Sequence, residues 1–597
     1  MNKKRSLPRR SYKKAPDRSS RNKKRGFVTK QFSGKMTLDK DRYFFRGFFK
    51  VTDFLSHLIS HIATRAYGAT AFCFGMVSLL LYFLRLSRDT TIITPIMGAA
   101  IAVLSIPFML SDKPLPLFLQ DFAVTDYIFF EFFCIKRFNK MESEQRFPIV
   151  ISVLFGIVLA AVGVIYPSWK LAVIIGCIVF AYVCLLSPEF SFFVSLIALP
   201  YMNFIPHSQT VFSTLILLTV VSFARKAAFG KRVVNFESYD AVIGVMMLLI
   251  LVSGFFSHGA HHLSRAVGMV FMVFGYTVAG NLVINRRLAD RAVNSIVISS
   301  IPPAALSLAK FAHMLWLGRG RELIDEGVYS VFSSGEAFAV FMIVAATFAI
   351  AMCRQCGKRH RIFYVCAAVM DFAALAMTGE FFAVLALLLG LGAYQLFRMG
   401  RWSSVFLAAL VFIPYLVLLL PNKLLNMLLS LIPSLEDGAT LFTLWSRSLR
   451  IFTDNILVGI GIGSESFAES MDKAGITAGD ASNVFLSFGI ELGVLSLLCF
   501  AALLVIRLIH RAGYYSYVRN SEVSTLAPVC SACVFALVAY GAVSYIFADM
   551  YAAYLFWCVF GIGSATLRVA KRESDDRVHY YEDTRASDSS AIDVEIG

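Results

Sequence analysis

The amino-acid sequence predicts an all-α, polytopic integral membrane protein. Of its 597 residues, 57% are hydrophobic and only 16% are charged, and the mean hydropathy is +0.68. A soluble globular chain of this length carries more charge and less apolar surface. Long apolar runs recur along the sequence, and many can cross a hydrocarbon core of roughly 30 Å as helices. Because helices satisfy their own backbone polar groups, they are the expected structure in lipid.

Five apolar runs show this pattern most clearly. They are residues 91–110, 148–166, 241–256, 381–397 and 484–509. Applying the rule of about twenty residues per span to the whole chain predicts roughly twelve to sixteen transmembrane helices. The range is wide because the runs between residues 190 and 223 are short. The aromatic stretch 118–133 suits the membrane interface as well as a span.

Most of the net charge of +17 lies in one segment, because residues 1–50 hold eighteen Lys and Arg against three Asp. Without apolar periodicity, residues 1–65 are predicted to form a mostly disordered arm on the cytoplasmic side. Its expected partners are anionic membrane lipids, and no nucleic acid is expected. An RNA-binding or protein-docking arm is the alternative. No secretory signal peptide is expected, since no apolar stretch follows at the usual distance.

The basic loops define a topology. With the arm in the cytoplasm, one threading places the short loops rich in Lys and Arg on the inner side. It predicts N-terminal transmembrane helices in residues 66–240, a transmembrane core in 241–420 and C-terminal transmembrane helices in 483–570. An acidic, disordered tail follows in 571–597, and both termini lie in the cytoplasm.

Residues 421–482 then form one large extracytoplasmic loop. Within it, residues 424–432 and 441–452 have the spacing of amphipathic helices that rest on the membrane surface. Long connections in otherwise compact chains often carry function. The loop is therefore the first place to look for a site.

Charged residues near the outer ends of the spans are the site candidates, because charge close to a hydrocarbon core is costly. The carboxylates are Glu336, Glu380, Glu491 and Asp549, and the arginines include Arg265, Arg447 and Arg450. Guanidinium groups bind phosphate oxygens in a bidentate manner, and a carboxylate can take a proton from a hydroxyl. The alternative is that these residues snorkel to water or form local ion pairs.

No metal and no cofactor are expected. Most of the eleven cysteines lie in apolar runs, where a thiol behaves as a small hydrophobic group. The pairs Cys353/Cys356 and Cys530/Cys533 have the spacing of half a zinc site, and neither has a second half. No glycine-rich phosphate loop precedes a helix.

Four motifs follow one another between residues 253 and 506. They are Ser333-Ser334-Gly335-Glu336, then Thr378-Gly379-Glu380-Phe381, then the segment from Trp445 to Ile456 with Gly459-Ile460-Gly461 and Phe467, and finally Ser482-Asn483-Val484-Phe485-Leu486 with Glu491-Leu492-Gly493. In order, spacing and expected side of the membrane they resemble the O-antigen ligase and O-antigen polymerase superfamily. A match to several motifs in sequence is more specific than a match to one.

The resemblance implies a membrane glycosyltransferase of the bacterial cytoplasmic membrane with its site on the outer face. Members of the family move a glycan from an undecaprenyl-diphosphate carrier to an acceptor glycan or glycolipid. Family arginines hold the diphosphate, and a histidine serves as base or positions the acceptor. Here Asn483 and Glu491 match the pattern. Ser482 occupies the position of the family histidine, and Phe381 and Leu441 occupy the positions of two family arginines. The resemblance is therefore that of a divergent member.

The site hypothesis follows from these matches and departures. Catalytic roles are assigned to Glu380, Glu491 and Asn483, with Asp480 as a further possible base, because serine cannot serve as a base unaided. Arg447 and Arg450 are assigned to the diphosphate, with support from Glu336, Arg265, Trp445 and Ser482.

Three functions remain open at the level of sequence. The leading one is a ligase or polymerase of polysaccharide assembly. The second is a noncatalytic relative that binds lipid-linked glycan or assembly proteins. The third is a flippase or another transporter, for which paired broken helices would be typical.

Overall fold

The computed structural model describes residues 34–36, 62–87, 91–135, 137, 149–228, 232, 234–256, 262–318, 328, 330–399, 436–472 and 478–595. Within these ranges the protein is almost entirely helical, which confirms the predicted all-α class. The two strands, β1 (Gly34–Met36) and β2 (Val234–Phe236), form one antiparallel pair, with Lys35 opposite Asn235.

The described residues contain nine helices that are long and apolar enough to cross a membrane. They are α2 (Thr64–Phe83), α7 (Ser168–Leu186), α9 (Ser208–Ala228), α11 (His262–Leu282), α12 (Arg286–Trp316), α14 (Gly335–Gln355), α16 (Phe381–Met399), α21 (Val484–Gly513) and α24 (Met550–Glu595). Four shorter apolar helices accompany them, namely α3 (Ile93–Met109), α6 (Ile149–Ala161), α10 (Ser238–Phe256) and α23 (Leu526–Gly541). The chain is therefore built as a multi-pass membrane protein.

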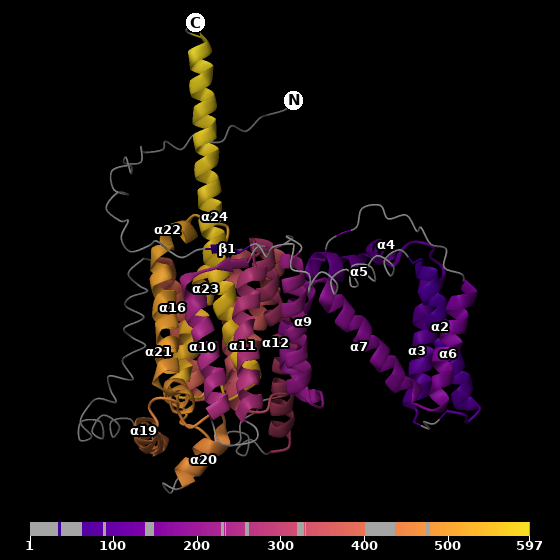
Figure 1. The fold of residues 1–597 in the computed structure, drawn as a ribbon, viewed down its shortest axis with the longest axis horizontal. Coiled ribbons are helices and arrows are strands. Elements are labelled where there is room, and N and C mark those ends of the chain that lie inside the picture. Colours follow the sequence, from indigo (N-terminus) through magenta and orange to yellow (C-terminus); the bar gives the residue numbers. More distant parts are fainter. Residues whose placement is uncertain are drawn as a thin grey trace.

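The remaining elements connect or cover these spans. They are α4 (Leu115–Asp121), α5 (Ala123–Thr125), the π-helix η2 (Asp126–Phe132), η3 (Val162–Val164), α8 (Pro188–Ala198), η4 (Leu199–Phe204), α15 (Lys358–Ala376), α19 (Glu436–Asp454), α20 (Ser464–Asp472) and α22 (Tyr515–Arg519). In the aromatic stretch 118–133, most residues fall in α4, α5 and η2, short elements that lie near one end of the bundle (Figure 1).

Helices α2, α3 and α6 pack on one another as a unit beside the main bundle, and α7 crosses from this unit to the bundle (Figure 1). Burial separates central from peripheral spans. In their most apolar segments, 94% of α24 and 83% of α14 are buried, against 6% of α7. Helices α14 and α24 are therefore the centre of the bundle, and α7 presents its side chains outward.

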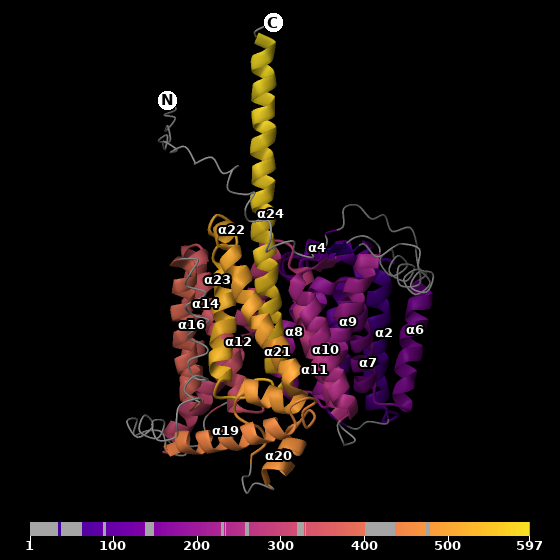
Figure 2. The same ribbon diagram turned by 60° about the vertical axis from the view of Figure 1, so that its left-hand side comes forward.

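The two ends of the bundle differ. Helices α19 and α20 lie at one end, here called the α19 end, and α24 projects from the opposite α24 end (Figures 1 and 2). The prediction of a disordered tail from Lys571 differs from the structure, because α24 stays helical to Glu595. Extending an existing helix needs no new nucleus, which favours continuation past the last apolar residue.

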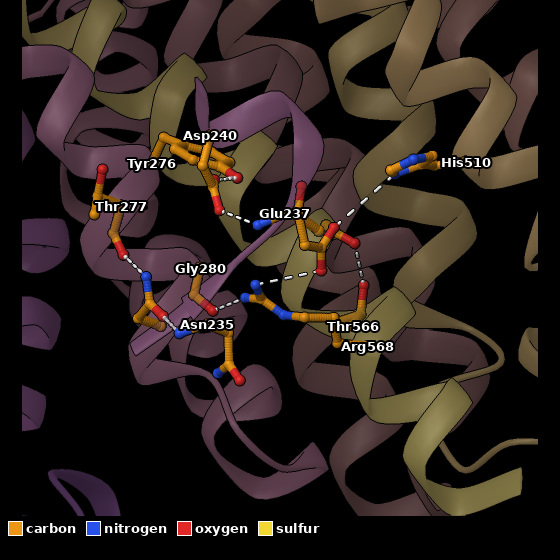
Figure 3. A network of polar contacts seen from close by, with 12 residues as sticks. Asn235, Glu237, Asp240, Tyr276, Thr277, Gly280, His510, Thr566 and Arg568 are labelled. Carbon is orange, nitrogen blue, oxygen red and sulfur yellow. Dashed lines mark hydrogen bonds and ion pairs between the residues drawn. The ribbon is translucent and has the colours of Figure 1, made fainter. Parts of the chain in front are cut away.

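At the α24 end a polar network fixes β2 to three helices (Figure 3). Glu237, just after β2, lies 3.4 Å from Arg568 of α24 and 3.9 Å from His510 of α21. The backbone N–H of Asn235 donates to the side chain of Asn281 at 2.9 Å. These contacts stabilise the end of the bundle opposite the candidate site.

Some predictions fall on residues outside the described ranges. The surface helix expected at 424–432 is one, and so are most of the basic arm and residues 400–435. Residues 441–452 are helical as expected, since they lie within α19, which runs across one end of the bundle (Figure 2).

Candidate functional site

Helix α21 is broken near its start, at Gly493. This glycine has φ 80° and ψ 173°, so residues 484–492 form a short helix of their own before the long span begins. A break removes helical hydrogen bonds from the backbone, and in a membrane each lost bond must be replaced. Helices of this kind often mark sites where ligands bind.

The turn after α19 supplies the replacements. The N–H of Ile460 donates to the carbonyl of Ile490 at 2.8 Å, and the N–H of Gly461 donates to the carbonyl of Glu491 at 3.2 Å. The N–H of Val494 in turn donates to the carbonyl of Ile456 at 2.8 Å. The motif that contains Gly459 and Gly461 is therefore joined directly to the motif that contains Glu491.

Glycine is required at this junction for two reasons. Gly459, Gly461 and Gly493 all have positive φ, which side chains with a Cβ rarely adopt. A Cβ at Gly459 or Gly493 would also collide with the backbone of the opposite segment. The close approach of the turn to the broken helix thus depends on these glycines.

A small apolar core supports the junction from the α19 end. Phe467 and Met471 of α20 are buried against Ala481 and Ile490, with Phe452 of α19 packed beside them. The surface helices are therefore part of the folded structure around the helix break.

Glu491 lies at the break and is held through both carboxylate oxygens. Its side chain is buried, with 6% of its surface exposed. Tyr545 donates its hydroxyl to Oε2 at 2.5 Å, and the backbone N–H of Gly463 donates to Oε1 at 3.2 Å. Arg265 adds a favourable charge interaction. A buried carboxylate needs such partners, because desolvation otherwise makes its charge costly.

Glu491 forms part of the wall of a cavity of about 550 Å³ at the α19 end. Its polar wall comes from five segments and includes Gln209, Thr210, Ser264, Arg265, Asp480, Glu491 and Tyr545. Its apolar wall includes Val267, Phe271 and Met272 of α11, together with Phe547 and Ala553. A pocket lined by both polar and apolar side chains suits an amphipathic ligand.

Arg265 and Asp480 are the other charged groups of this wall. Arg265 lies in the first turns of α11, and a Cβ at Gly463 would overlap its guanidinium. Asp480 precedes α21, and its Oδ1 accepts the backbone N–H of Ser482 at 2.7 Å. Burial raises the pKa of Asp480, and the hydrogen bonds from Ser482 offset part of this rise. The cavity thus places a cation beside two carboxylates.

Two further predicted carboxylates, Glu336 and Glu380, are not among the residues that line the cavity. Glu336, at the start of α14, lies within electrostatic range of Asp480 and Glu380. Glu380, just before α16, accepts the hydroxyl of Tyr540 at 3.3 Å. The motifs around residues 336, 380 and 491 are therefore brought to the same end of the bundle.

Asn483 has a structural position. Its side-chain oxygen accepts the N–H groups of Phe485 and Leu486 at 3.0 and 3.1 Å, and its amide donates to the carbonyl of Ala542 at 2.8 Å. It therefore caps α21 and joins it to the segment before α24. Ser482 next to it has φ 45° and is not among the residues that line the cavity.

The predicted residues of α19 lie apart from the cavity wall. Arg450 is exposed, whereas Arg447 and Trp445 are half-buried, and none of the three lines the cavity. Of the arginines assigned from sequence, Arg265 is the one that the fold brings to Glu491. Sequence patterns did not point to Tyr545, Gln209 or Thr210. Their only local signal is a polar side chain near the end of an apolar run.

Among the residues that the structure describes, no three His, Cys, Asp or Glu side chains are grouped to hold a metal ion. In the comparisons with known proteins, no family model and no curated sequence matches the chain. The geometry of the cavity is therefore the basis for assigning a function.

Proposed function

We propose that the chain is a divergent glycosyltransferase, similar to the O-antigen ligases and polymerases. It moves a glycan from an undecaprenyl-diphosphate carrier to an acceptor glycan or glycolipid in cell-surface polysaccharide assembly. The α19 end faces outward from the bacterial cytoplasmic membrane, and both termini lie inside. Anionic lipids are the proposed partner of the basic N-terminal arm.

The observation that carries this proposal is the mixed lining of the cavity. It combines Arg265 and other polar groups with apolar side chains, among them Phe271 and Met272 of the same helix α11. A lipid-linked diphosphate needs both, because its phosphates require cationic donors and its prenyl chain requires an apolar surface. The reaction then takes place between a carrier in the membrane and an acceptor that enters from the α19 end.

The position of the cavity favours a different arginine for the diphosphate contact from those assigned by sequence. Arg265 faces Glu491 across the cavity wall, whereas Arg450 points to solvent on α19. We therefore assign the diphosphate contact to Arg265 in preference to Arg447 and Arg450. Arginine suits this contact because its planar fork matches phosphate oxygens.

The test is glycan transfer by the purified protein in lipid nanodiscs, with undecaprenyl-diphosphate glycan as donor. Arg265→Ala removes charged hydrogen bonds worth about 1.5–3 kcal/mol. We expect donor affinity to fall roughly 10- to 150-fold. Arg519→Ala, which removes an exposed arginine in α22, is the control and should bind donor as the wild type does.

Each result has a defined meaning. Donor binding without transfer by the wild type would identify a noncatalytic relative. Carrier movement across the bilayer without transfer would identify a flippase. Loss of binding in Arg447→Ala or Arg450→Ala, with normal binding in Arg265→Ala, would return the phosphate contact to α19.

A further inference from the structure

Asp480 lines the cavity and is held by one neighbouring residue. Its Oδ1 accepts the backbone N–H of Ser482 at 2.7 Å, and the side chain of Ser482 also hydrogen-bonds the carboxylate. Ser482 adopts φ 45°, a left-handed conformation that closes the short turn from residue 480 to 482. Such Asx turns fix the side chain of their first residue. Ser482 therefore orients this carboxylate in the cavity wall.

The other carboxylates at this end are already engaged or stand away from the cavity. Both oxygens of Glu491 accept hydrogen bonds, from Tyr545 and from Gly463. Asp549 caps α24 through the N–H groups of Tyr551 and Ala552 at 2.8 and 3.0 Å, and it also accepts the hydroxyl of Ser333. Glu336 and Glu380 do not line the cavity. A proton acceptor must reach its proton directly or through one water, which singles out Asp480.

We propose that Asp480 is the general base of the transfer reaction, an inference that rests on the proposed function. The acceptor hydroxyl attacks the anomeric carbon of the carrier-bound sugar, and a new carbon–oxygen bond forms. The bond between that carbon and the phosphate oxygen breaks, and undecaprenyl diphosphate leaves with the electron pair. The hydroxyl proton passes to the carboxylate of Asp480. The carboxylate thus takes the role that the resembled family gives to the histidine at the position of Ser482.

The surroundings of Asp480 suit this role. Burial raises the pKa of its carboxyl toward neutral pH, and a carboxylate with a higher pKa is a stronger base. The groups that face it are Glu336 of α14, Glu491 of α21 and Tyr545 before α24, and Arg265 of α11 lies on the same cavity wall. Glu491 instead interacts with Arg265 and so positions the arginine that is proposed to bind the diphosphate.

The experiment compares Asp480→Asn, Asp480→Glu and the wild type over a range of pH, with donor binding measured in parallel. Wild-type kcat/KM should fall at low pH, where Asp480 is protonated. Asp480→Asn should lose between about 10²- and 10⁴-fold in kcat while donor affinity stays within about twofold. It should also lose the acid limb of the pH profile. Asp480→Glu should recover part of the rate.

Formate gives a second measurement. In Asp480→Ala the cavity has space for a small carboxylate, and added formate should restore part of the transfer rate. Formate should not affect Asp454→Asn, which replaces an exposed carboxylate on α19 and serves as the matched control. Because rescue requires a folded cavity, this measurement separates a missing base from a misfolded protein.

Two results would overturn the assignment. One is a wild-type rate and an unchanged acid limb in Asp480→Asn. The other is loss of the acid limb in Glu491→Gln while Asp480→Asn keeps it. Absence of transfer by the wild-type protein would instead refute the proposed function, so the two failures are distinguishable.

Discussion

Glu491 and Asp480 are neighbours in the cavity wall and differ in how their charge is supported. Glu491 is buried and receives donors from Tyr545 and Gly463. Among the described residues, Asp480 is held by Ser482, through its N–H at 2.7 Å and through its side chain. Glu491, which interacts with Arg265, is suited to hold that cation in place, and Asp480 is suited to take a proton.

The partly unsupported charge of Asp480 should reduce the stability of the protein. Its pKa is raised by burial, so at low pH the folded state keeps its proton longer than the unfolded state. The free energy of unfolding therefore falls as pH rises from about 4 to the raised pKa of folded Asp480, and it does not change further above that pKa. Asp480→Asn cannot titrate, so its gain in melting temperature over the wild type should grow with pH and then level off.

Thermal unfolding of the detergent-solubilised protein between about pH 4 and 8 measures this gain. The exposed control, Asp454→Asn, should show no dependence of this kind. A difference between Asp480→Asn and the wild type that stays the same at every pH would contradict the account.

Sequence patterns predicted some of these residues and missed others for a physical reason. Glu491 and Arg265 stand out because charge is rare at the ends of apolar runs. Tyr545 does not, because an apolar run tolerates tyrosine and its contact with Glu491 spans 54 positions. The role of Asn483 also depends on distance in sequence, since its amide bonds to Ala542.

At the scale of elements, the site depends on a helix that stops and restarts. The break at Gly493 frees backbone groups, and the turn from Ile456 to Gly461 satisfies them. The same contacts fix the position of Glu491, two residues before the break. The segment that follows α19 thus reaches the cavity at Ile462 and Gly463, whereas the arginines of α19 do not line it.

The break predicts a strong effect of Gly493→Ala. Its conformation, φ 80° and ψ 173°, is open almost only to glycine, and a Cβ would meet the carbonyl oxygen of Leu457. We expect a loss of at least about 1–3 kcal/mol in unfolding free energy. Gly176→Ala in α7 is the control, because a Cβ there meets nothing within 4 Å. It should be neutral or stabilising by about 0.5–1 kcal/mol. Equal melting temperatures for the two variants would show that the break is not required.

The elements themselves were largely predictable, and their interruptions were not. Apolar runs and the amphipathic pattern of residues 441–452 gave helices near the expected positions, because burial in lipid or at its surface fixes their periodicity. The run from residue 484 to 509 gave no sign of a break. Gly493 is one glycine in an apolar stretch, and the turn that makes the break possible lies more than thirty residues earlier.

At the scale of the whole molecule, charge distinguishes the two ends of the bundle. Helices α9, α14, α16 and α21 all carry basic residues in their last turns, among them Lys226, Arg354, Arg398 and Arg511. These turns lie at the α24 end (Figure 1). The α19 end instead collects Glu336, Glu380, Asp480 and Glu491, and the last two line the cavity. An excess of Lys and Arg marks the cytoplasmic side of membrane proteins.

This asymmetry predicts which end reacts from outside the cell. In a variant without the eleven native cysteines, Thr453→Cys places a thiol on the exposed face of α19, and Glu522→Cys places one at the α24 end. A membrane-impermeant maleimide should label Thr453→Cys in intact cells. It should label Glu522→Cys only after the membrane is permeabilised, which also shows that this thiol is reactive. The reverse pattern would put the cavity in the cytoplasm, where a carrier-linked glycan awaiting transfer on the outer face could not reach it.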